Sequence, residues 1–199
     1  VRDTESGLAL DVRARCVVNA TGVWVDALRE QDGASKAIVA PSQGVHIVVD
    51  SKFLPGHTGL MIPKTKDGRV LFAVSWLGKV ILGTTDTPRH DLVKEPLAFE
   101  EEIDFILNEA ARYLRHPPTR NDVTSIWVGL RPLVKPSKEE GENTKTLSRE
   151  HVVLVARSGL VTVTGGKWTT YRAMAEDVMS KCLEHQLLLS KQATGTEHL

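Results

Sequence analysis

The stretch 161–172, VTVTGGKWTTYR, combines residue types that can hold an anion or a cofactor. A β-branched run ends at Gly165-Gly166, and a lysine and two threonines then open a helical pattern. A strand that enters a helix through a glycine turn leaves backbone N–H groups free at the positive end of the helix dipole. Such a turn can bind an anion or the electron-rich edge of a cofactor. It can equally be an ordinary connection, and the stretch alone leaves both interpretations open.

His46 and Arg131 are further side chains that can act on a substrate. His46 alternates with Val45, Ile47 and Val49 and therefore points to the opposite face of a strand. An imidazole can take a proton near neutrality, although a lone histidine on a strand is often structural. Arg131 stands in an apolar segment stiffened by proline, where an unpaired charge is costly. It is either paired in the core or presented to a ligand anion through its planar fork.

Two turns of small polar residues complete the set of candidates. Asn19-Ala20-Thr21-Gly22 closes an apolar run, where small residues let the backbone approach a ligand closely. Residues 83–88, GTTDTP, end a β-rich region. Asp86 in this turn can cap backbone amides or contact a substrate, and we favour the structural role. Each turn taken alone also fits a plain connection.

Composition excludes several classes of protein. The 199 residues include 25 basic and 25 acidic side chains, so nothing indicates a nucleic acid or another polyanion as partner. Cys16 and Cys182 lie far apart without metal-ligand spacing, which argues against a zinc site and favours a reducing compartment. No apolar run approaches the length of a membrane span, and no signal peptide is visible. Attachment at a membrane surface stays open.

The elements that must position these residues follow from hydrophobic periodicity. Residues 1–22 predict two strands joined at residues 3–7. The helix that follows should turn Trp24 and Leu28 inward, with Val25 as a further candidate. Residues 32–41 and 135–143 read as loops, and residues 44–83 predict an antiparallel meander. A helical face from Tyr171 to Leu183 follows the glycine turn. The expected helices cover residues 24–30, 97–114 and 171–183, and further strands cover residues 123–134, 146–156 and 160–164.

Seven motifs, taken in order, resemble the FAD-dependent, quinone-reducing glycerol-3-phosphate dehydrogenases of the D-amino-acid-oxidase-like flavoprotein group. They span nearly the whole chain, and GLRPLV with GGKWTTYR is the most discriminating pair. Val23 departs from the proline expected after NATG, which alters the rigidity of that turn. The motifs are ARCVVNATGVWVDALR (14–29), PSQGVHIVVD (41–50), DGRVLFAVSW (67–76), GTTDTP (83–88), VGLRPLV (128–134), LSREHVV (147–153) and TVTGGKWTTYRAMAED (162–177).

The resemblance implies a mixed α+β and α/β fold. An antiparallel-sheet substrate (cap) domain with a helix, residues 38–145, would be flanked by parts of a Rossmann-like FAD-binding domain, residues 1–37 and 146–185, with a tail at 186–199. The family's N-terminal G-x-G-x-x-G unit and its helical C-terminal domain have no counterpart in this sequence. We therefore expect an internal fragment that is inactive alone and does not retain FAD.

The family reaction oxidises sn-glycerol 3-phosphate to dihydroxyacetone phosphate. A hydride leaves C2 for flavin N5, a base takes the hydroxyl proton, and the reduced FAD passes electrons to quinone. By resemblance, Arg131 is the expected phosphate or substrate ligand and Lys167 a second cation. His46 is the expected base or hydrogen-bonding partner of the substrate.

The resemblance also implies two stretches that contact FAD. The glycine turn would direct N–H groups at the pyrimidine edge of the isoalloxazine, where a helix N-terminus favours negative charge on the reduced flavin. The NATG turn would lie along the extended body of the cofactor. The expected contacts are Ala20, Thr21, Gly22, Trp24, Gly165, Gly166, Lys167, Trp168 and Thr169.

Members of this family attach peripherally to membranes. The resemblance thus implies a cytoplasmic protein on the bacterial inner membrane, or a protein of the mitochondrial inner membrane. Two alternatives stay open: another flavin oxidase of the same group that acts on amines or amino acids, and a non-redox binding domain of cap-domain shape. Turnover of glycerol 3-phosphate discriminates the first, and the gene sequence upstream of Val1 discriminates the second.

Overall fold

The computed structural model describes residues 1–135 and 150–189, and the chain divides into two compact units. Unit 1 comprises Val1–Ala37 and Arg149–Leu199, and unit 2 comprises Ile38–Ser148. The assignment of unit 1 to FAD binding and of unit 2 to the substrate stays a prediction. The mixed α/β class with an antiparallel sheet is confirmed.

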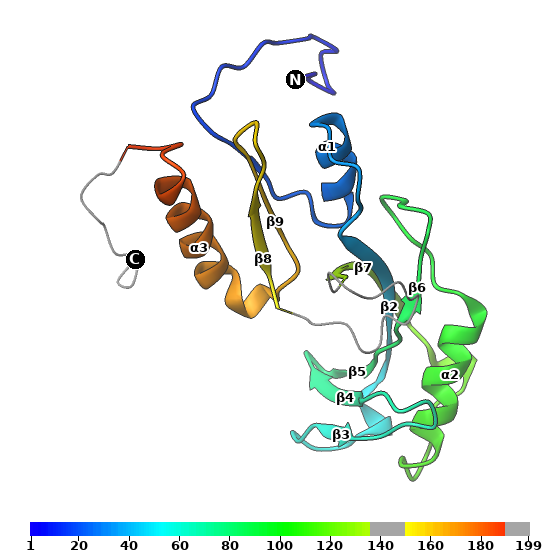
Figure 1. Cartoon of the computed structure of the whole chain (residues 1–199). Helices are drawn as coiled ribbons and strands as arrows, with labels where there is room; N and C mark the ends of the chain where they lie inside the picture. The colour runs from blue at the N-terminus through cyan, green and yellow to red at the C-terminus, as the bar shows by residue number, and fades with distance from the viewer. Residues whose placement is uncertain (136–149, 190–199) are drawn as a thin grey trace. The chain divides into compact units, whose positions relative to one another are not determined.

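Unit 2 is built around one long strand, β2 (Val39–Asp50), in an antiparallel sheet (Figure 1). Along the sheet the order is β3-β4-β5-β2-β6, and β7 pairs with β2 over residues 125–134. Leu77 and Gly78 link β4 to β5 with φ values of 47° and 74°, as a two-residue hairpin loop requires. The other strands are β3 (Leu60–Ile62), β4 (Leu71–Trp76), β5 (Lys79–Gly83), β6 (Thr87–Pro88) and β7 (Ser125–Val134).

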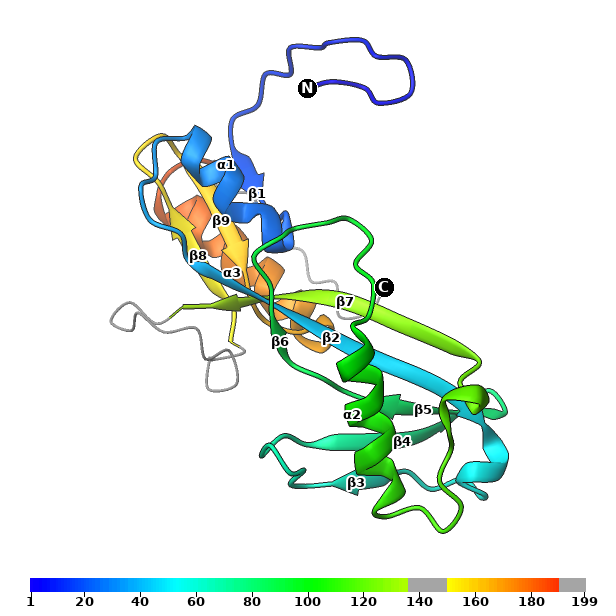
Figure 2. The ribbon, with the colours of Figure 1, turned by 90° about the vertical axis from the view of Figure 1, so that its right-hand side faces the viewer.

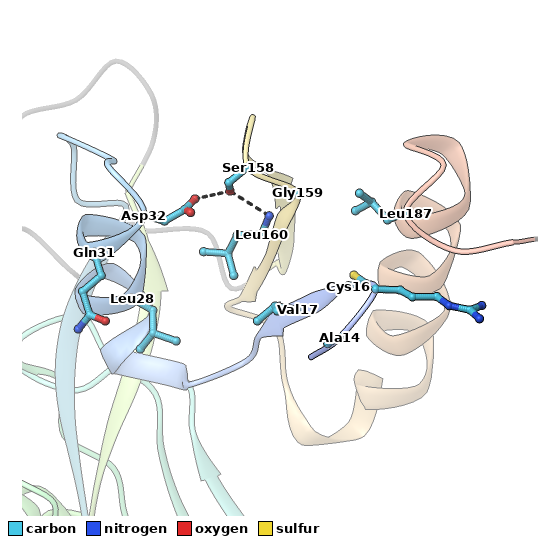
Figure 3. A pocket seen from close by; sticks show the side chains of 11 residues that line it. Ala14, Cys16, Val17, Leu28, Gln31, Asp32, Ser158, Gly159, Leu160 and Leu187 are labelled. Carbon is cyan, nitrogen blue, oxygen red and sulfur yellow. Dashed lines mark hydrogen bonds between the residues drawn. The ribbon is translucent and has the colours of Figure 1, made fainter. Parts of the chain in front are cut away.

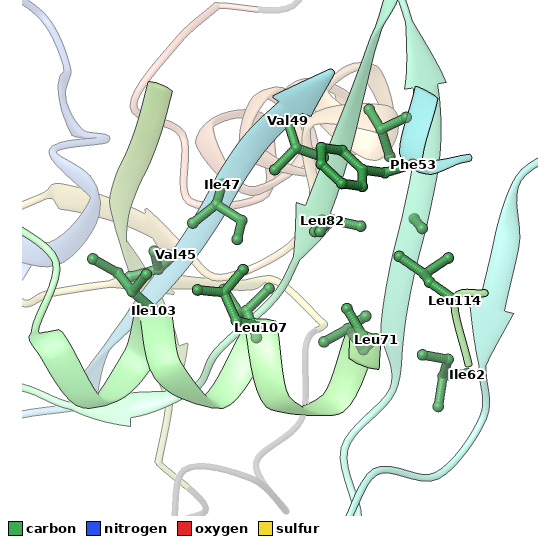
Figure 4. Packing of buried hydrophobic residues seen from close by; sticks show 14 residues of the cluster. Val45, Ile47, Val49, Phe53, Ile62, Leu71, Leu82, Ile103, Leu107 and Leu114 are labelled. Atoms are coloured by element: carbon green, nitrogen blue, oxygen red, sulfur yellow. The ribbon is translucent and has the colours of Figure 1, made fainter. Parts of the chain in front are cut away.

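Helix α2 (Glu100–Ala111) covers one face of this sheet, and the core of unit 2 lies between them (Figure 4). Val45, Ile47 and Val49 are fully buried on that face, and Ile106 faces them from α2. Each such side chain contributes roughly 1.5–3 kcal/mol on burial. The helix begins where the Glu102 carboxylate accepts the backbone N–H of Phe99 at 2.9 Å. Single turns of 3-10 helix, η2 (Ser51–Phe53) and η3 (Arg120–Asp122), complete the unit.

Unit 1 contains a small sheet in which β9 (Leu160–Thr164) lies between β1 (Val17–Asn19) and β8 (Val152–Val155) (Figure 2). Strands β1 and β9 are parallel, and β8 and β9 form a hairpin. Buried Val161, Val163, Val178 and Cys182 form the core under α3. The helical elements are η1 (Gly22–Trp24), α1 (Val25–Gln31), η5 (Trp168–Thr170) and α3 (Tyr171–Glu184).

Several expected elements were wrong or displaced. Residues 1–12 form only an isolated bridge between Arg2 and Ala9, because no strand within the described residues covers their alternating apolar side chains. Strand β2 begins at Val39, inside the expected loop 32–41, since β7 pairs with it there. The helix expected at 97–114 covers only Glu100–Ala111.

Two expected faces also differ in detail. The expected inward position of Trp24 was wrong, because its side chain is 39% exposed, whereas Val25, the further candidate, is fully buried. On α3, Val178 and Cys182 are buried, whereas Tyr171 and Leu183 are exposed. Most of the expected charged loop at 135–143 and the tail beyond residue 189 lie outside the described residues.

Candidate functional site

His46 and Arg131 lie on one face of the unit 2 sheet, opposite α2. Ser42 on β2 pairs with Arg131 on β7, and His46 pairs with Trp127 on β7 and with Gly83 on β5. Directly opposed residues of an antiparallel pair project to the same face, and residues two apart on a strand share it. The structure therefore brings together the two candidate residues of this unit.

The guanidinium of Arg131 lies over Gly44, in a slot that is open only because residue 44 has no side chain. Its Nη1 donates to the Thr85 carbonyl at 3.0 Å and its Nη2 to the Thr84 hydroxyl at 2.8 Å. A Cβ placed on Gly44 would lie 2.0 to 2.5 Å from three guanidinium atoms. Any side chain at position 44 must therefore displace the guanidinium.

The turn that holds Arg131 is itself anchored by α2. The Thr85 hydroxyl donates to the buried Glu102 carboxylate at 3.0 Å and accepts the Val45 backbone N–H at 3.0 Å. The Thr87 hydroxyl donates to the same Glu102 oxygen at 2.6 Å. Because a buried carboxylate needs such donors, this network fixes the turn firmly. Asp86 accepts the Ser42 hydroxyl at 2.5 Å, and its structural role stays a prediction.

The His46 imidazole is half-buried beside this arginine. Burial first, and the positive charge of Arg131 second, lower the pKa of His46 below its ordinary value. Gly83 leaves room for the ring, since a Cβ there would lie 2.3 Å from His46 Cδ2. A hollow of about 360 Å³ opens beside it, lined by His46, Phe72, Val74, Ile81, Gly83 and Trp127. A neutral imidazole at this position can accept a proton.

The lowered pKa of His46 is directly measurable. Its ring protons should titrate in NMR with a midpoint below the usual value of about 6.5. As the pH falls below about 6.5, His46 therefore binds protons more readily in the unfolded chain than in the folded one. The contribution of His46 to the free energy of unfolding is present above that pH and is lost as the pH falls toward the pKa of the folded state.

An Arg131→Gln variant separates the two causes of this shift. The His46 midpoint should move upward yet stay below its ordinary value, because burial is the larger cause. A wild-type midpoint above about 6.5 would contradict this description of the site.

Unit 1 places the two predicted cofactor-binding turns at one edge of its sheet. Because β1 and β9 run parallel, the NATG turn after Asn19 and the glycine turn after Thr164 both follow the carboxyl ends of adjacent strands. Ligands of open α/β sheets bind at this edge. Positive φ angles of 79° and 73° at Gly165 and Gly166 shape the second turn.

Buried Asn19 holds the first turn in place. Its amide donates to the Val25 carbonyl at 2.9 Å, and its carbonyl oxygen accepts the Thr21 hydroxyl at 2.8 Å. Ala20, Thr21 and Gly22 thereby form a rigid corner before η1, with Gly22 at a φ of 63°. Trp24 ends η1 and is partly exposed.

The second turn has features that fit the edge of a cofactor. Within the described residues, the buried Thr164 hydroxyl has no hydrogen-bond partner. A buried polar group in that state costs free energy that a ligand atom could recover. The backbone of Lys167 is tied to the Thr170 hydroxyl at 3.2 Å. A Cβ on Gly166 would lie 2.6 Å from Met174 Sδ, so the turn packs tightly on α3.

The remaining predicted residues of this turn are exposed. Trp168 is 86% exposed and stacks on Tyr171 with a centroid separation of 5.6 Å. Thr169 follows it in η5, where the first backbone N–H groups of a helical turn lack partners within the helix. Lys167 belongs to unit 1 with these residues, whereas His46 and Arg131 belong to unit 2.

Sequence reasoning missed the residues that support Arg131 and His46. Gly44, Gly83 and Glu102 are ordinary in the sequence, and their roles depend on strand register and on the packing of α2. The run GTTDTP was noted as a polar turn, and its threonines would have been the best signal. No group of three or more metal-ligating side chains occurs in residues 1–135 and 150–189.

Comparison with known proteins defines the class to which these two sites belong. Residues 1–172 match the family model of the FAD dependent oxidoreductases, DAO. The chain belongs to this family, and the resemblance inferred from its motifs is confirmed.

Particular relatives are glycerol-3-phosphate dehydrogenases. The chain is 47% identical to the mitochondrial enzyme of Bos taurus and 46% identical to that of Homo sapiens, each over 92% of the chain. It is 43% identical to the mitochondrial enzyme of Arabidopsis thaliana over its whole length. The chain spans 25% of the length of the two mammalian relatives and 31% of the plant relative.

Solved structures agree with this relationship. The glycerol-3-phosphate dehydrogenase of Bacillus halodurans, complexed with FAD, superposes with a TM-score of 0.78 at 34% identity, over 97% of this chain and 36% of that one. Glycine oxidase of Geobacillus kaustophilus superposes at 0.55 with 18% identity over 92% of this chain and 46% of that one. The second likeness shows a shared fold alone.

Proposed function

We propose that this chain forms part of an FAD-dependent glycerol-3-phosphate dehydrogenase, which oxidises sn-glycerol 3-phosphate to dihydroxyacetone phosphate. The observation that carries the proposal is the slot over Gly44, which holds the Arg131 guanidinium beside His46. Identities of 43–47% to proteins of that name over 92–100% of the chain support it.

Arg131 binds the substrate phosphate or positions the substrate. A guanidinium is a planar fork whose geometry matches an oxyanion, and its charge strengthens each hydrogen bond. Because Thr84 and Thr85 hold it in place before substrate arrives, little side-chain entropy is lost on binding. Lys167 supplies a second positive charge from the glycine turn.

His46 acts as the base or as the hydrogen-bonding partner of the substrate hydroxyl. Burial and Arg131 favour its neutral form, which has a lone pair available for the proton of the C2 alcohol. The imidazolium that forms beside Arg131 is disfavoured, so the proton is readily passed on to solvent. The hollow of about 360 Å³ next to the ring leaves room for the substrate hydroxyl to approach it.

FAD, when bound, supplies the acceptor for the hydride of C2. The residues that hold it are those of the two turns in unit 1: Ala20, Thr21, Gly22 and Trp24 along its body, and Gly165, Gly166, Lys167, Trp168 and Thr169 at its flavin edge. The Thr164 hydroxyl, which has no partner among the described residues, and the helical N-terminus at η5 support this assignment.

The proposal extends to partners and location. Electrons leave the complete protein to a quinone, and the protein attaches peripherally to the mitochondrial inner membrane, or to the inner membrane of a bacterium. Relatives named as mitochondrial in mammals, a plant and a nematode support the mitochondrial alternative. None of the helices in residues 1–135 and 150–189 is long and apolar enough to cross a membrane.

Turnover by the complete protein that contains this chain tests the function. With a soluble quinone as acceptor, sn-glycerol 3-phosphate should be oxidised, and glycerol should be at least about 100-fold poorer because it lacks the phosphate that Arg131 binds. Glycine and D-amino acids serve as the comparison substrates. Preferential oxidation of an amine or amino acid would support the alternative flavin oxidase, and no oxidation of any substrate by FAD-loaded protein would support a non-redox binding domain.

A further inference from the structure

Two cysteines that are 166 residues apart in the sequence meet in unit 1. The Sγ atoms of Cys16 and Cys182 lie 3.6 Å apart, and both thiols are free. Cys16 directly precedes β1, and Cys182 lies in the last turn of α3. The contact follows from the fold, because β1 pairs with β9 and α3 packs on β8 and β9.

The two thiols differ in their access to solvent. Cys182 is 1% exposed and packs among Val161 and Val178. Cys16 is only half-buried and lines a cavity of about 420 Å³ with Ala14, Val17 and Leu187 (Figure 3). A small oxidant can therefore reach Cys16 first, with Cys182 directly behind it.

We propose that Cys16 and Cys182 form a site of reversible thiol oxidation, at which a peroxide or a low-molecular-weight disulfide converts the pair into an intramolecular disulfide. The S–S bond requires a separation of about 2.05 Å, and the two sulfur atoms are already in contact at 3.6 Å. The inference is independent of the enzymatic function.

The chemistry is balanced in two steps. The Cys16 thiolate and hydrogen peroxide, with one proton, give a sulfenic acid and water. The Cys182 thiol then attacks the Cys16 sulfur, forms the disulfide and releases a second water molecule. Two thiols thus lose two electrons and two protons to one peroxide. With oxidised glutathione the pair instead releases two glutathione thiols.

The order of attack follows from the environment of Cys182. Burial, together with the neighbouring Cys16, raises the pKa of the Cys182 thiol. A protonated buried thiol is a poor initial nucleophile, so Cys182 resolves the oxidised Cys16 instead of reacting first. Its proximity offsets the low thiolate fraction, because the second step is intramolecular.

The disulfide would link the segment before β1 to the end of the helix that follows the glycine turn. A cross-link between residues so distant in sequence removes much of the freedom of the unfolded chain. We expect the midpoint of thermal unfolding to rise by at least about 5 °C on oxidation. Amide exchange in the last turn of α3 should slow in parallel.

Mass spectrometry of the 199-residue chain tests the proposal. The reduced protein is treated with hydrogen peroxide or with oxidised glutathione, and is digested with trypsin without reduction. A monomer lighter by two hydrogen atoms is expected, with peptide 16–29 joined to peptide 182–191. Dithiothreitol should restore both thiols.

Two matched variants complete the experiment. Cys182→Ser should leave Cys16 as a mixed disulfide with glutathione, and Cys16→Ser should leave Cys182 largely unmodified in the folded protein. Neither variant should gain thermal stability on oxidation. The proposal is overturned if wild-type protein yields only intermolecular dimers, if Cys16 is overoxidised while Cys182 stays free, or if both thiols survive.

Discussion

Replacing Arg131 by alanine in the complete protein should raise KM for glycerol 3-phosphate by about 100-fold. The guanidinium makes charge-assisted hydrogen bonds, and the loss of about 3 kcal/mol of binding to a phosphate corresponds to that factor. Thr84 and Thr85 hold the guanidinium in position, so alanine removes a preorganised binding group. Steady-state kinetics across substrate concentration measure the effect.

Two further variants distinguish the loss of the Arg131 guanidinium from a general loss of stability. Arg131→Lys keeps the charge without the planar fork and should recover only part of the affinity. Arg120→Ala removes an equally large side chain that pairs with Glu100 and Asp104 of α2, and it should leave KM within about twofold. An unchanged KM in Arg131→Ala would remove Arg131 from the substrate site.

The second large effect is expected from a single added methyl group. Gly44→Ala places a Cβ within 2.0 to 2.5 Å of the Arg131 guanidinium, which must leave its slot. The displaced guanidinium loses its hydrogen bonds to Thr84 and Thr85 and no longer lies where it binds the substrate, so KM should rise about 10- to 100-fold although Arg131 is still present. The same kinetic measurement applies.

The sheet offers a matched control for this substitution. Gly129 is the direct partner of Gly44 across β2 and β7, and a Cβ at Gly129 would meet nothing within 4 Å. Gly129→Ala should therefore change KM by less than about threefold.

A double variant tests whether Gly44 acts through the arginine. If it does, Gly44→Ala combined with Arg131→Ala should be no worse than Arg131→Ala alone. Additive effects of the two changes would show that Gly44 acts elsewhere, and equal effects of Gly44→Ala and Gly129→Ala would show that the slot over Gly44 is not needed.

Much of the local structure could be predicted from patterns that are short in sequence. The alternation around His46 correctly assigned its face, because strand periodicity is a local property of the backbone. Residues 160–164 were expected as the last strand and are observed as β9. The motifs GLRPLV and GGKWTTYR indicated the family, which the match over residues 1–172 confirms.

The expected elements were wrong where pairing with a segment distant in the sequence determines the structure. Strand β2 starts at Val39, since β7 supplies hydrogen bonds there that no local sequence pattern predicts. Residues 1–22 were expected to form two strands, yet the apolar side chains Leu8, Leu10 and Val12 are exposed and no described strand pairs with them. A sequence pattern typical of a strand does not produce a sheet unless another strand pairs with it.

The glycine turn shows what the sequence determined by itself and what tertiary structure decided. Residue types alone identified Gly165-Gly166 followed by Lys167 as a turn able to hold an anion or cofactor, with an ordinary connection as the alternative. Only the parallel pairing of β1 with β9 placed it at the same edge as Ala20, Thr21 and Gly22. Only the register of β2 and β7 placed Gly44 beneath Arg131, and only the packing of α3 brought Cys182 to Cys16. Such contacts join residues tens to more than a hundred positions apart, and no local pattern specifies them.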